Sequence, residues 1–250
     1  MSVKVENHNG LLRITIARPE RLNAVDVATM AALGDQFESA ATDDAVRAVL
    51  LTGEGRGFSS GFDLADTGSS GEVVMDTANR MIRSVVACPK PVVAKVNGPA
   101  AGVGASLVLA CDLSYAVEQS YLLLAFRNVG LMVDGGASVL VAAAAGRGRA
   151  AEMALLGEKI PARKALGYGL LTDVFADDEF DAKVDAIADR LAGGPRQAQA
   201  LIKQAINAAT LHELDAALER EKTGQLSLRG SPDNVEGVTA MFQKRKPDFE

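Results

Sequence analysis

Several residue types that support common chemistries are scarce in this chain. Its 250 residues include no Trp and only two His, His8 and His212, so a His-rich metal site is nearly excluded. Two Cys, Cys88 and Cys111, are too few for a disulfide framework and lack zinc-binding spacing, which favours a reducing compartment. Any acid or base in a catalytic role is therefore expected to be a carboxylate.

Excess positive charge and long apolar runs are also lacking. Lys and Arg number 26 against 32 Asp and Glu, for a net charge of −6, which argues against a nucleic-acid-binding surface. The longest uncharged run, between Lys95 and Asp112, is shorter than the ~18 apolar residues of a spanning helix, and charges occupy the N-terminal stretch where a signal peptide would be apolar. We expect a cytoplasmic protein without nucleic-acid or membrane partners.

The sequence does contain a regular alternation of strand-like and helix-like segments. Hydrophobic residues make up 48 % of the chain, enough for a sizeable core in one main domain. Alternating β-branched runs and helical periodicity predict an α/β core, with strands at 3–7, 11–16, 46–52, 91–96, 112–116 and 121–124, and helices at 27–41, 72–86, 105–110 and 137–145. Helix 137–145 is so uniformly apolar that it is expected to be buried.

The last third of the chain is expected to be mostly helical. Periodicity predicts helices there, at 148–156, 162–168, 178–191, 195–209, 213–228 and 232–242. The break at Gly193-Gly194-Pro195 suggests a division near residue 190. The predicted organisation is therefore a core of residues 1–190 and a helical region of residues 191–250.

Three short motifs have a functional interpretation and a simpler structural one. Gly57-Phe-Ser-Ser-Gly61 matches the nucleophile elbow of serine hydrolases, but turn-forming residues follow it instead of the required helix. Residues 98–106 place small residues at a helix start after a strand, where free N–H groups could hold an oxyanion and where close packing explains the glycines equally well. Asp134, before Gly135-Gly136 and an apolar helix, is by itself expected to be a helix N-cap.

Seven segments in the same order resemble the crotonase family, also called the enoyl-CoA hydratase/isomerase family. They span essentially the whole chain: Arg18-Pro-Glu-Arg-Leu-Asn-Ala, Gly57-Phe-Ser-Ser-Gly-Phe-Asp-Leu, Lys90-Pro-Val-Val-Ala-Lys-Val-Asn-Gly-Pro-Ala-Ala-Gly, Cys111-Asp-Leu-Ser-Tyr-Ala, Asp134-Gly-Gly, Ala165-Leu-Gly-Tyr-Gly-Leu, and Glu236-Gly-Val through Lys244-Arg-Lys-Pro-Asp-Phe. The resemblance implies a crotonase-like spiral of ββα units and a C-terminal helical trimerisation region. It also implies a homotrimer or dimer of trimers.

The resemblance further implies an acyl-CoA thioester substrate, with no cofactor apart from the coenzyme A of the substrate and no metal. In this family two backbone N–H groups hold the thioester oxygen, and by position these belong to Phe62 and Val103. Valine stands here where the family usually has glycine, which keeps the N–H but narrows the space beside the thioester. The positions that match coenzyme A or acyl contacts are Arg21, Leu22, Ala24, Ser60, Asp63, Leu64, Leu131 and Lys246.

The chain departs from the hydratase members at both of their catalytic glutamates. Ser106 and Phe126 stand at those positions, and neither is a carboxylate. Asp134 matches the catalytic aspartate of isomerase members, and its apolar neighbours are expected to raise its pKa. These matches imply 3-enoyl-CoA to 2-enoyl-CoA isomerisation with Asp134 as base.

Other reactions of the family fit less well. Aryl-CoA dehalogenation uses a His and a Trp near the ring, which this chain lacks there, and dienoyl isomerisation uses three carboxylates, of which only Asp134 is present. Two alternatives stay open. One is a hydratase that positions water through Ser106 and Asp134, and the other is a catalytically silent acyl-CoA-binding oligomer in which Asp134 only caps a helix.

Overall fold

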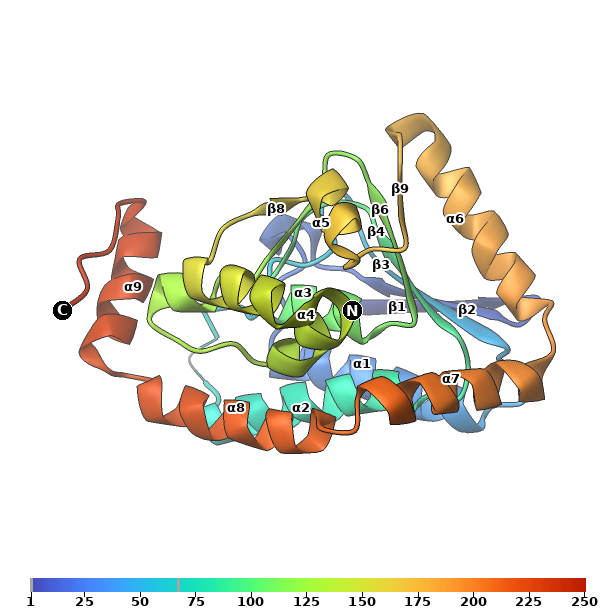
Figure 1. The fold of residues 1–250 in the computed structure, drawn as a ribbon, viewed down its shortest axis with the longest axis horizontal. Coiled ribbons are helices and arrows are strands. Elements are labelled where there is room, and N and C mark those ends of the chain that lie inside the picture. The colour runs from blue at the N-terminus through green and yellow to red at the C-terminus, as the bar shows by residue number, and fades with distance from the viewer. Residues whose placement is uncertain (1, 67) are drawn as a thin grey trace.

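The computed structural model describes residues 2–66 and 68–250 and contains two β-sheets surrounded by helices (Figure 1). The larger sheet has six strands in the order β1-β2-β3-β4-β6-β9, with bounds Val3–His8, Leu11–Ile16, Ala48–Gly53, Val92–Val96, Leu113–Val117 and Asp173–Phe175. The smaller sheet has the order β5-β7-β8, with bounds Ala100–Ala101, Tyr121–Leu123 and Ile160–Pro161. Two 3-10 helices, η1 (Pro19–Arg21) and η2 (Phe126–Val129), lie in the loops.

The large sheet begins with a hairpin and continues as parallel strands. Strands β1 and β2 pair antiparallel through Asn9 and Gly10, whose positive φ angles of 52° and 86° form the tight turn. Strands β2, β3, β4, β6 and β9 are mutually parallel, so a chain crossover separates each neighbouring pair. Their side chains are mostly buried because helices cover both faces.

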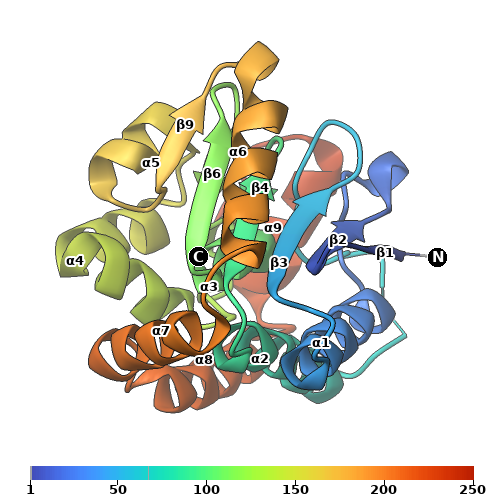
Figure 2. The ribbon, with the colours of Figure 1, turned by 90° about the vertical axis from the view of Figure 1, so that its right-hand side faces the viewer.

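Helices on opposite faces of the sheet form two separate cores. On one face, α1 (Val27–Thr42), α2 (Gly71–Ala87) and α3 (Val103–Ala110) contribute to the larger core. On the other, α6 (Asp177–Ala192) lies across the central strands, as Figure 2 shows. Phe180, Val184 and Ala188 of α6 pack against residues of these strands. Asp26 caps α1 through the Thr29 N–H, as the sequence predicted.

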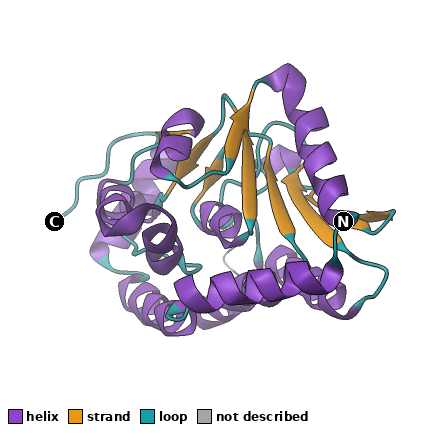
Figure 3. Ribbon diagram, turned by 45° about the vertical axis from the view of Figure 1, so that its right-hand side comes forward, coloured by secondary structure: helices purple, strands orange, loops and turns teal. Residues whose placement is uncertain are grey.

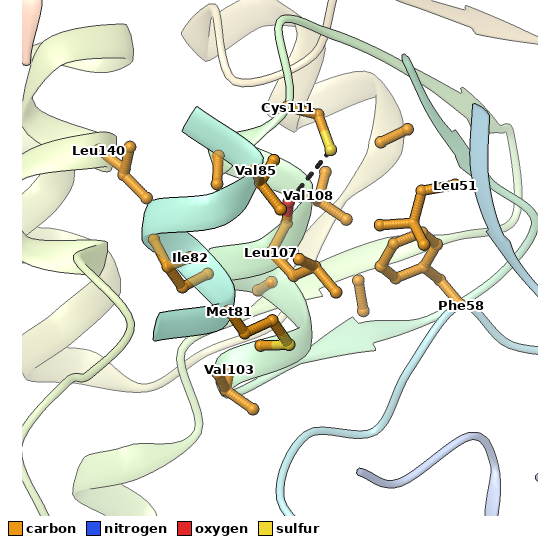
Figure 4. Close-up of a cluster of buried hydrophobic side chains, with 14 of the residues drawn as sticks. Leu51, Phe58, Met81, Ile82, Val85, Val103, Leu107, Val108, Cys111 and Leu140 are labelled. Atoms are coloured by element: carbon orange, nitrogen blue, oxygen red, sulfur yellow. Dashed lines mark hydrogen bonds between the residues drawn. The ribbon is translucent and has the colours of Figure 1, made fainter. Parts of the chain in front are cut away.

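Helix α3 lies inside the larger core and is short, apolar and buried nearly all round. Leu107 and Val108 of this helix lie among side chains of α2, α4 and β3 (Figure 4). The Cys111 Sγ–H donates to the Leu107 carbonyl at 3.3 Å and closes the end of the helix. This packing fixes the position of the α3 N-terminus, where Val103 begins the helix.

The remaining helices lie beside the sheet and below it in Figure 3. They are α4 (Ala137–Leu156), α5 (Ala162–Tyr168), α7 (Arg196–Thr210), α8 (Leu214–Leu228) and α9 (Pro232–Gln243). Helix α8 packs on α2 and α4, while α9 packs on η2. Residues beyond 190 thus contact the core extensively, and the division at about residue 190 stays a prediction. No helix in the described ranges is long and apolar enough to cross a membrane.

The two helices expected at 137–145 and 148–156 are present as the two segments of α4, which meet at a kink at Gly146, where φ is 80° and ψ is 163°. The structure corrects two other features of the sequence prediction. Ala143 and Ala144 are exposed, so this apolar helix is not fully buried within the chain. The segment expected to be mostly helical also contains β9, which adds an edge strand beside β6. Apolar pattern alone cannot tell burial inside a chain from an apolar surface.

An ion pair between the buried Lys203 and the partly exposed Asp112 anchors α7 to the core. Lys203 is only 7 % exposed, and its Nζ lies 2.8 Å from Asp112 Oδ2 and donates to the carbonyls of Val85 and Lys90. A charge removed from water in this way must be compensated by its partner.

Asp112→Asn is expected to destabilise the fold by about 3 kcal/mol, because it leaves the buried Lys203 ammonium without its counter-charge. Denaturant unfolding measures the change. Adding Lys203→Met to Asp112→Asn removes the unpaired ammonium charge. The double variant should therefore recover most of the lost stability. Equal stability of wild type and Asp112→Asn would contradict the anchoring role of the pair.

Candidate active site

Two loops that are about 40 residues apart in sequence run side by side at the carboxyl ends of β3 and β4. Ser59 pairs in parallel register with Ala100, and the Ala101 N–H donates to the Ser59 carbonyl at 2.9 Å. The pairing brings Gly61 against Gly102, so that a Cβ on Gly102 would lie 3.7 Å from the Gly61 Cα. The residues that follow these two glycines are therefore neighbours in space.

Those following residues are Phe62 and Val103, the two predicted oxyanion donors. Both line the same cavity. Within residues 2–66 and 68–250, neither the Phe62 N–H nor the Val103 N–H donates a hydrogen bond to the protein. Val103 is the first residue of α3, where backbone N–H groups have no partner in the helix. The arrangement therefore offers two unused N–H donors at one wall of the cavity.

The cavity itself is apolar and small, with a volume of about 160 Å³. Its walls combine α2, the paired loops, η2, α8 and α9, and the lining residues are Met30, Ser60, Gly61, Phe62, Leu64, Val74, Met75, Ala78, Gly102, Val103, Ala125, Phe126, Val129, Leu131, Asp134, Gln225, Arg229 and Met241. An apolar cavity with a few polar groups is typical of small-molecule binding sites.

Asp134 brings a carboxylate into this apolar cavity. The Gln225 Nε2–H donates to Asp134 Oδ2 at 3.1 Å, while Oδ1 is buried without a hydrogen-bond partner in the described part of the chain. Burial raises the pKa of Asp134 to about 8, and the negative charge of Glu221 adds to the rise. The carboxyl group is thus poised to gain or lose a proton near neutral pH.

The structure overturns the expectation that Asp134 is the N-cap of the following helix. Gly136 occupies the cap position of α4, and the Asp134 side chain makes no capping bond. Both oxygens of Glu221, on α8, accept from the helix start instead, Oε2 from the Gly136 N–H and Oε1 from the Ser138 N–H. A carboxylate distant in sequence satisfies the helix start, which leaves Asp134 free to face the cavity.

The two positions that match hydratase glutamates are placed differently from each other. Phe126 lines the cavity. Ser106 is fully buried behind the cavity wall, and its hydroxyl donates to the backbone carbonyl of Asp134 at 2.8 Å. Ser106, predicted to contact the substrate, is thus not among the residues that line the cavity.

The structure brings some of the predicted coenzyme A positions together. The Ser60 N–H donates to the Leu22 carbonyl and its hydroxyl to the Arg21 carbonyl, so these two segments are adjacent. Among the predicted positions, Ser60, Leu64 and Leu131 line the cavity. The segment that ends in Ala24 borders the same loop through Val25, whose N–H donates to the Gly61 carbonyl.

Asp63 and Lys246 are predicted coenzyme A positions that do not line the cavity. Asp63 accepts from Arg18, with its Oδ2 2.9 Å from the guanidinium Nη2, and so takes part in a half-buried ion pair. Lys246 is exposed near the C-terminus. The structure therefore gives Asp63 a local structural partner and leaves Lys246 on the surface.

Ser59 is unsuited to the nucleophile role that the Gly57–Gly61 motif suggests. It is fully buried, and its hydroxyl donates to the Asn23 carbonyl at 2.8 Å. The same oxygen accepts from the Gly61 N–H at 3.2 Å. The hydroxyl therefore shapes the loop and does not face the cavity.

Sequence reasoning missed most of the apolar lining and all of the lining from α8. The missed side chains come from α1, α2, η2 and its N-cap, α8 and its C-cap, and α9, and they are Met30, Val74, Met75, Ala78, Ala125, Val129, Gln225, Arg229 and Met241. Gln225 and Arg229 are spaced as neighbours on one helix face, but nothing in that spacing identifies the element they face.

Comparisons with known proteins show the family of this chain. Residues 6–250 match the model of the enoyl-CoA hydratase/isomerase family. The chain belongs to that family. It is 38 % identical to the 1,2-epoxyphenylacetyl-CoA isomerase of Escherichia coli K12, over 96 % of this chain and 95 % of that protein.

Solved structures of the family confirm the predicted crotonase fold. The crystal structure of an enoyl-CoA hydratase from Mycobacterium avium subsp. paratuberculosis K-10 matches with a TM-score of 0.95 and 50 % identity, over 100 % of this chain and 99 % of that one. A probable enoyl-CoA hydratase of Rhodobacter capsulatus is 38 % identical over 99 % of this chain and 97 % of that protein. The family is enzymatic and acts on acyl-CoA substrates, and relatives of equal similarity carry both isomerase and hydratase names.

Gly61→Ala is expected to destabilise the fold by about 1–2 kcal/mol or more, because Gly61 has a φ of +93° and the new Cβ would lie 2.8 Å from the Ala101 carbonyl oxygen. Thermal unfolding measures the loss. Gly148→Ala is the matched control, since that glycine has open space and lies in α4, and it should be neutral or stabilising. Equal effects of the two variants would contradict the close approach of the loops.

Proposed function

We propose that this enzyme isomerises 3-enoyl-CoA to 2-enoyl-CoA with Asp134 as the base and Phe62 and Val103 as oxyanion donors. The observation that carries the proposal is that Asp134, whose Oδ1 is buried and without a hydrogen-bond partner in the described part of the chain, lines the same cavity as Phe62 and Val103, whose backbone N–H groups are unused. An enolate needs both features, a base for the proton and donors for the charge that develops on oxygen.

The reaction requires one proton to move between two carbons. Asp134 takes a proton from C2, and the C–H electron pair forms an enolate whose oxygen accepts from the Phe62 and Val103 N–H groups. The enolate collapses to form the C2=C3 double bond, and the electrons of the former C3=C4 bond take the proton back from Asp134 at C4. Removing one donor from such an oxyanion site typically raises the barrier by about 2.7–4 kcal/mol.

The apolar surroundings of Asp134 favour proton transfer over water addition. Phe126 lines the cavity at a position where a family hydratase has a glutamate. At the other such position, the Ser106 hydroxyl already donates a hydrogen bond to the Asp134 carbonyl. Neither side chain is placed to hold an attacking water. A hydratase that uses Ser106 and Asp134 together is thus the weaker alternative.

The second alternative is a non-catalytic protein, an oligomer that binds acyl-CoA without turning it over. Its premise was that Asp134 serves only as a helix cap, but Glu221 performs the capping. Burying a carboxylate costs folding free energy, and Asp134 does not repay that cost as a helix cap. This favours a chemical role for Asp134.

The same proposal assigns coenzyme A to the surface beside the paired loops. Arg21, Leu22, Ala24 and Ser60 lie together there, and Leu64 and Leu131 continue into the acyl cavity. The enzyme would need no cofactor beyond the coenzyme A of its substrate. We place the enzyme in the cytoplasm. Free thiols such as those of Cys88 and Cys111 persist in a reducing compartment, and acyl-CoA thioesters are present there.

Asp134→Asn is expected to lower isomerisation at least about 100-fold, because an amide cannot accept and return the proton. Purified wild type and variant are incubated in D2O with matched 3-enoyl-CoA and 2-enoyl-CoA, and mass spectrometry scores isomer, hydrated product and deuterium at C2. The wild type should form the isomer and incorporate deuterium at C2. The variant should do neither, although it still binds the substrate.

Other outcomes separate the alternatives. Hydrated product from wild type at a useful rate would identify a hydratase. Binding without turnover across chain lengths would identify the silent binding protein. Unfolding curves of wild type and Asp134→Asn show whether a loss of activity is a loss of fold.

We also propose that the chain assembles as a homotrimer or a dimer of trimers. Helix α7 exposes Leu201, Ile202 and Ile206 by 65 %, 58 % and 57 %. A groove beside them is lined by Ile202, Ile206 and the exposed Ala143 and Ala144 of α4. A neighbouring subunit would remove this contiguous apolar surface from water.

Sedimentation at micromolar concentration is therefore expected to give the mass of a trimer or hexamer. The double variant Ile202→Glu/Ile206→Glu should shift the protein towards monomer, since it buries charge in the apolar contact. Val5→Glu, at an exposed apolar residue of the edge strand β1, is the matched control and should sediment like wild type. A monomeric wild type would contradict the assembly.

A further inference from the structure

Two polar side chains on α8 contact the segment that carries Asp134. Glu221 and Gln225 are four residues apart and therefore lie on one face of the helix. Their exposed fractions are 1 % and 6 %, so both are enclosed by the protein. A buried carboxylate and a buried amide together hold a segment that is some 90 residues away in sequence.

Glu221 holds the chain directly after Asp134. Its Oε2 accepts from the Gly136 N–H at 2.7 Å and its Oε1 from the Ser138 N–H at 2.9 Å. Both N–H groups belong to the start of α4, where the helix dipole favours a negative charge. Glu221 thus fixes this turn and places a carboxylate near Asp134.

Gln225 holds the chain directly before Asp134 and the carboxylate itself. Its Nε2 donates to the Met132 carbonyl and, at 3.1 Å, to Asp134 Oδ2. One amide group therefore bridges backbone and side chain of the same segment. The bond to Oδ2 determines that Oδ1 is the oxygen left without a partner.

The charged groups around Asp134 come from α8. Glu221 faces the carboxylate and raises its pKa, Arg220 lies next to Glu221, and Arg229 lines the cavity one turn beyond Gln225. Facing elements contribute neutral side chains, namely Val103 and Ser106 from α3 and Phe126 and Val129 from η2. Arg127 of η2 lies over the Phe249 ring instead.

We propose that Glu221 and Gln225 are positioning residues for the Asp134 base. Gln225 selects the carboxylate oxygen that faces the acyl group, and Glu221 fixes the turn and strengthens the base through its negative charge. The inference rests on the proposed function, because it assigns to α8 the control of that reaction.

Glu221→Gln is expected to lower the pKa of Asp134 from about 8, because the neighbouring negative charge is removed while the side chain keeps its size. Each unit by which the pKa of Asp134 falls gives about tenfold more of its ionised, basic form at pH 6. At pH 9, where the base form predominates in both proteins, the variant is slower because its base is weaker. The pH profiles of kcat/KM should therefore cross.

Two further variants complete the comparison. Gln225→Met removes the bridge to Asp134 and should lower kcat by about tenfold or more, with KM changed by less than about threefold, because substrate binding does not use the bridge. Glu219→Gln makes the same charge change on an exposed part of α8, where Glu219 pairs with Arg83, and should leave the pH profile unchanged.

A titration of Asp134 followed by carboxyl NMR in the substrate-free protein separates this inference from the proposed function. Asp134→Asn assigns the signal. A lower pKa in Glu221→Gln supports the inference even if wild type makes no isomer, an outcome that would refute only the proposed function. Equal pKa values in wild type and Glu221→Gln, or one uniform loss of rate across pH, would overturn the role of Glu221. Unchanged kcat in Gln225→Met would overturn that of Gln225.

Discussion

The close pairing of two loops is the constraint on which the site depends. Backbone pairing between Ser59 and Ala100–Ala101 brings Gly61 against Gly102, and a Cβ on Gly61 would lie 2.8 Å from the Ala101 carbonyl oxygen. The backbone then turns out of the pairing at Phe62 and Val103, which leaves both N–H groups without protein acceptors in the described structure. Gly61 is required because the loops approach closely, and Gly102 suits its position because its φ is +53°.

The second constraint is the enclosure of Asp134 in apolar surroundings. Burial raises the cost of its charged form, so its pKa lies near 8 and not near 4. Such a site can persist because the rest of the structure holds it in place: Ser106 binds the Asp134 carbonyl, Gln225 binds Oδ2, and Glu221 satisfies the start of α4. Two of these three supports come from α8, so the C-terminal helices contribute to the site as well as to the surface.

Local signals were sufficient for most secondary structure. The Asn9-Gly10 turn, the Asp26 cap and the helical periodicity of α5 to α9 are local properties of the chain, and the structure contains the corresponding elements. Strand β9 was missed because three residues are too few for a periodic pattern, and it is held by pairing with β6. The helix expected at 137–145, which forms the first part of α4, was expected to be buried, although Ala143 and Ala144 are exposed within the chain.

The sequence by itself determined the family, the order of elements and the candidate site residues Phe62, Val103 and Asp134, because these depend on short motifs and their order. Tertiary structure alone decided the environment of each group. The cap that the local sequence alone assigns to Asp134 is provided by Glu221, and the hydroxyl of Ser106, which was expected at the substrate, donates to the Asp134 carbonyl. Burial, pKa and hydrogen-bond partners depend on segments far apart in sequence, which no local pattern specifies.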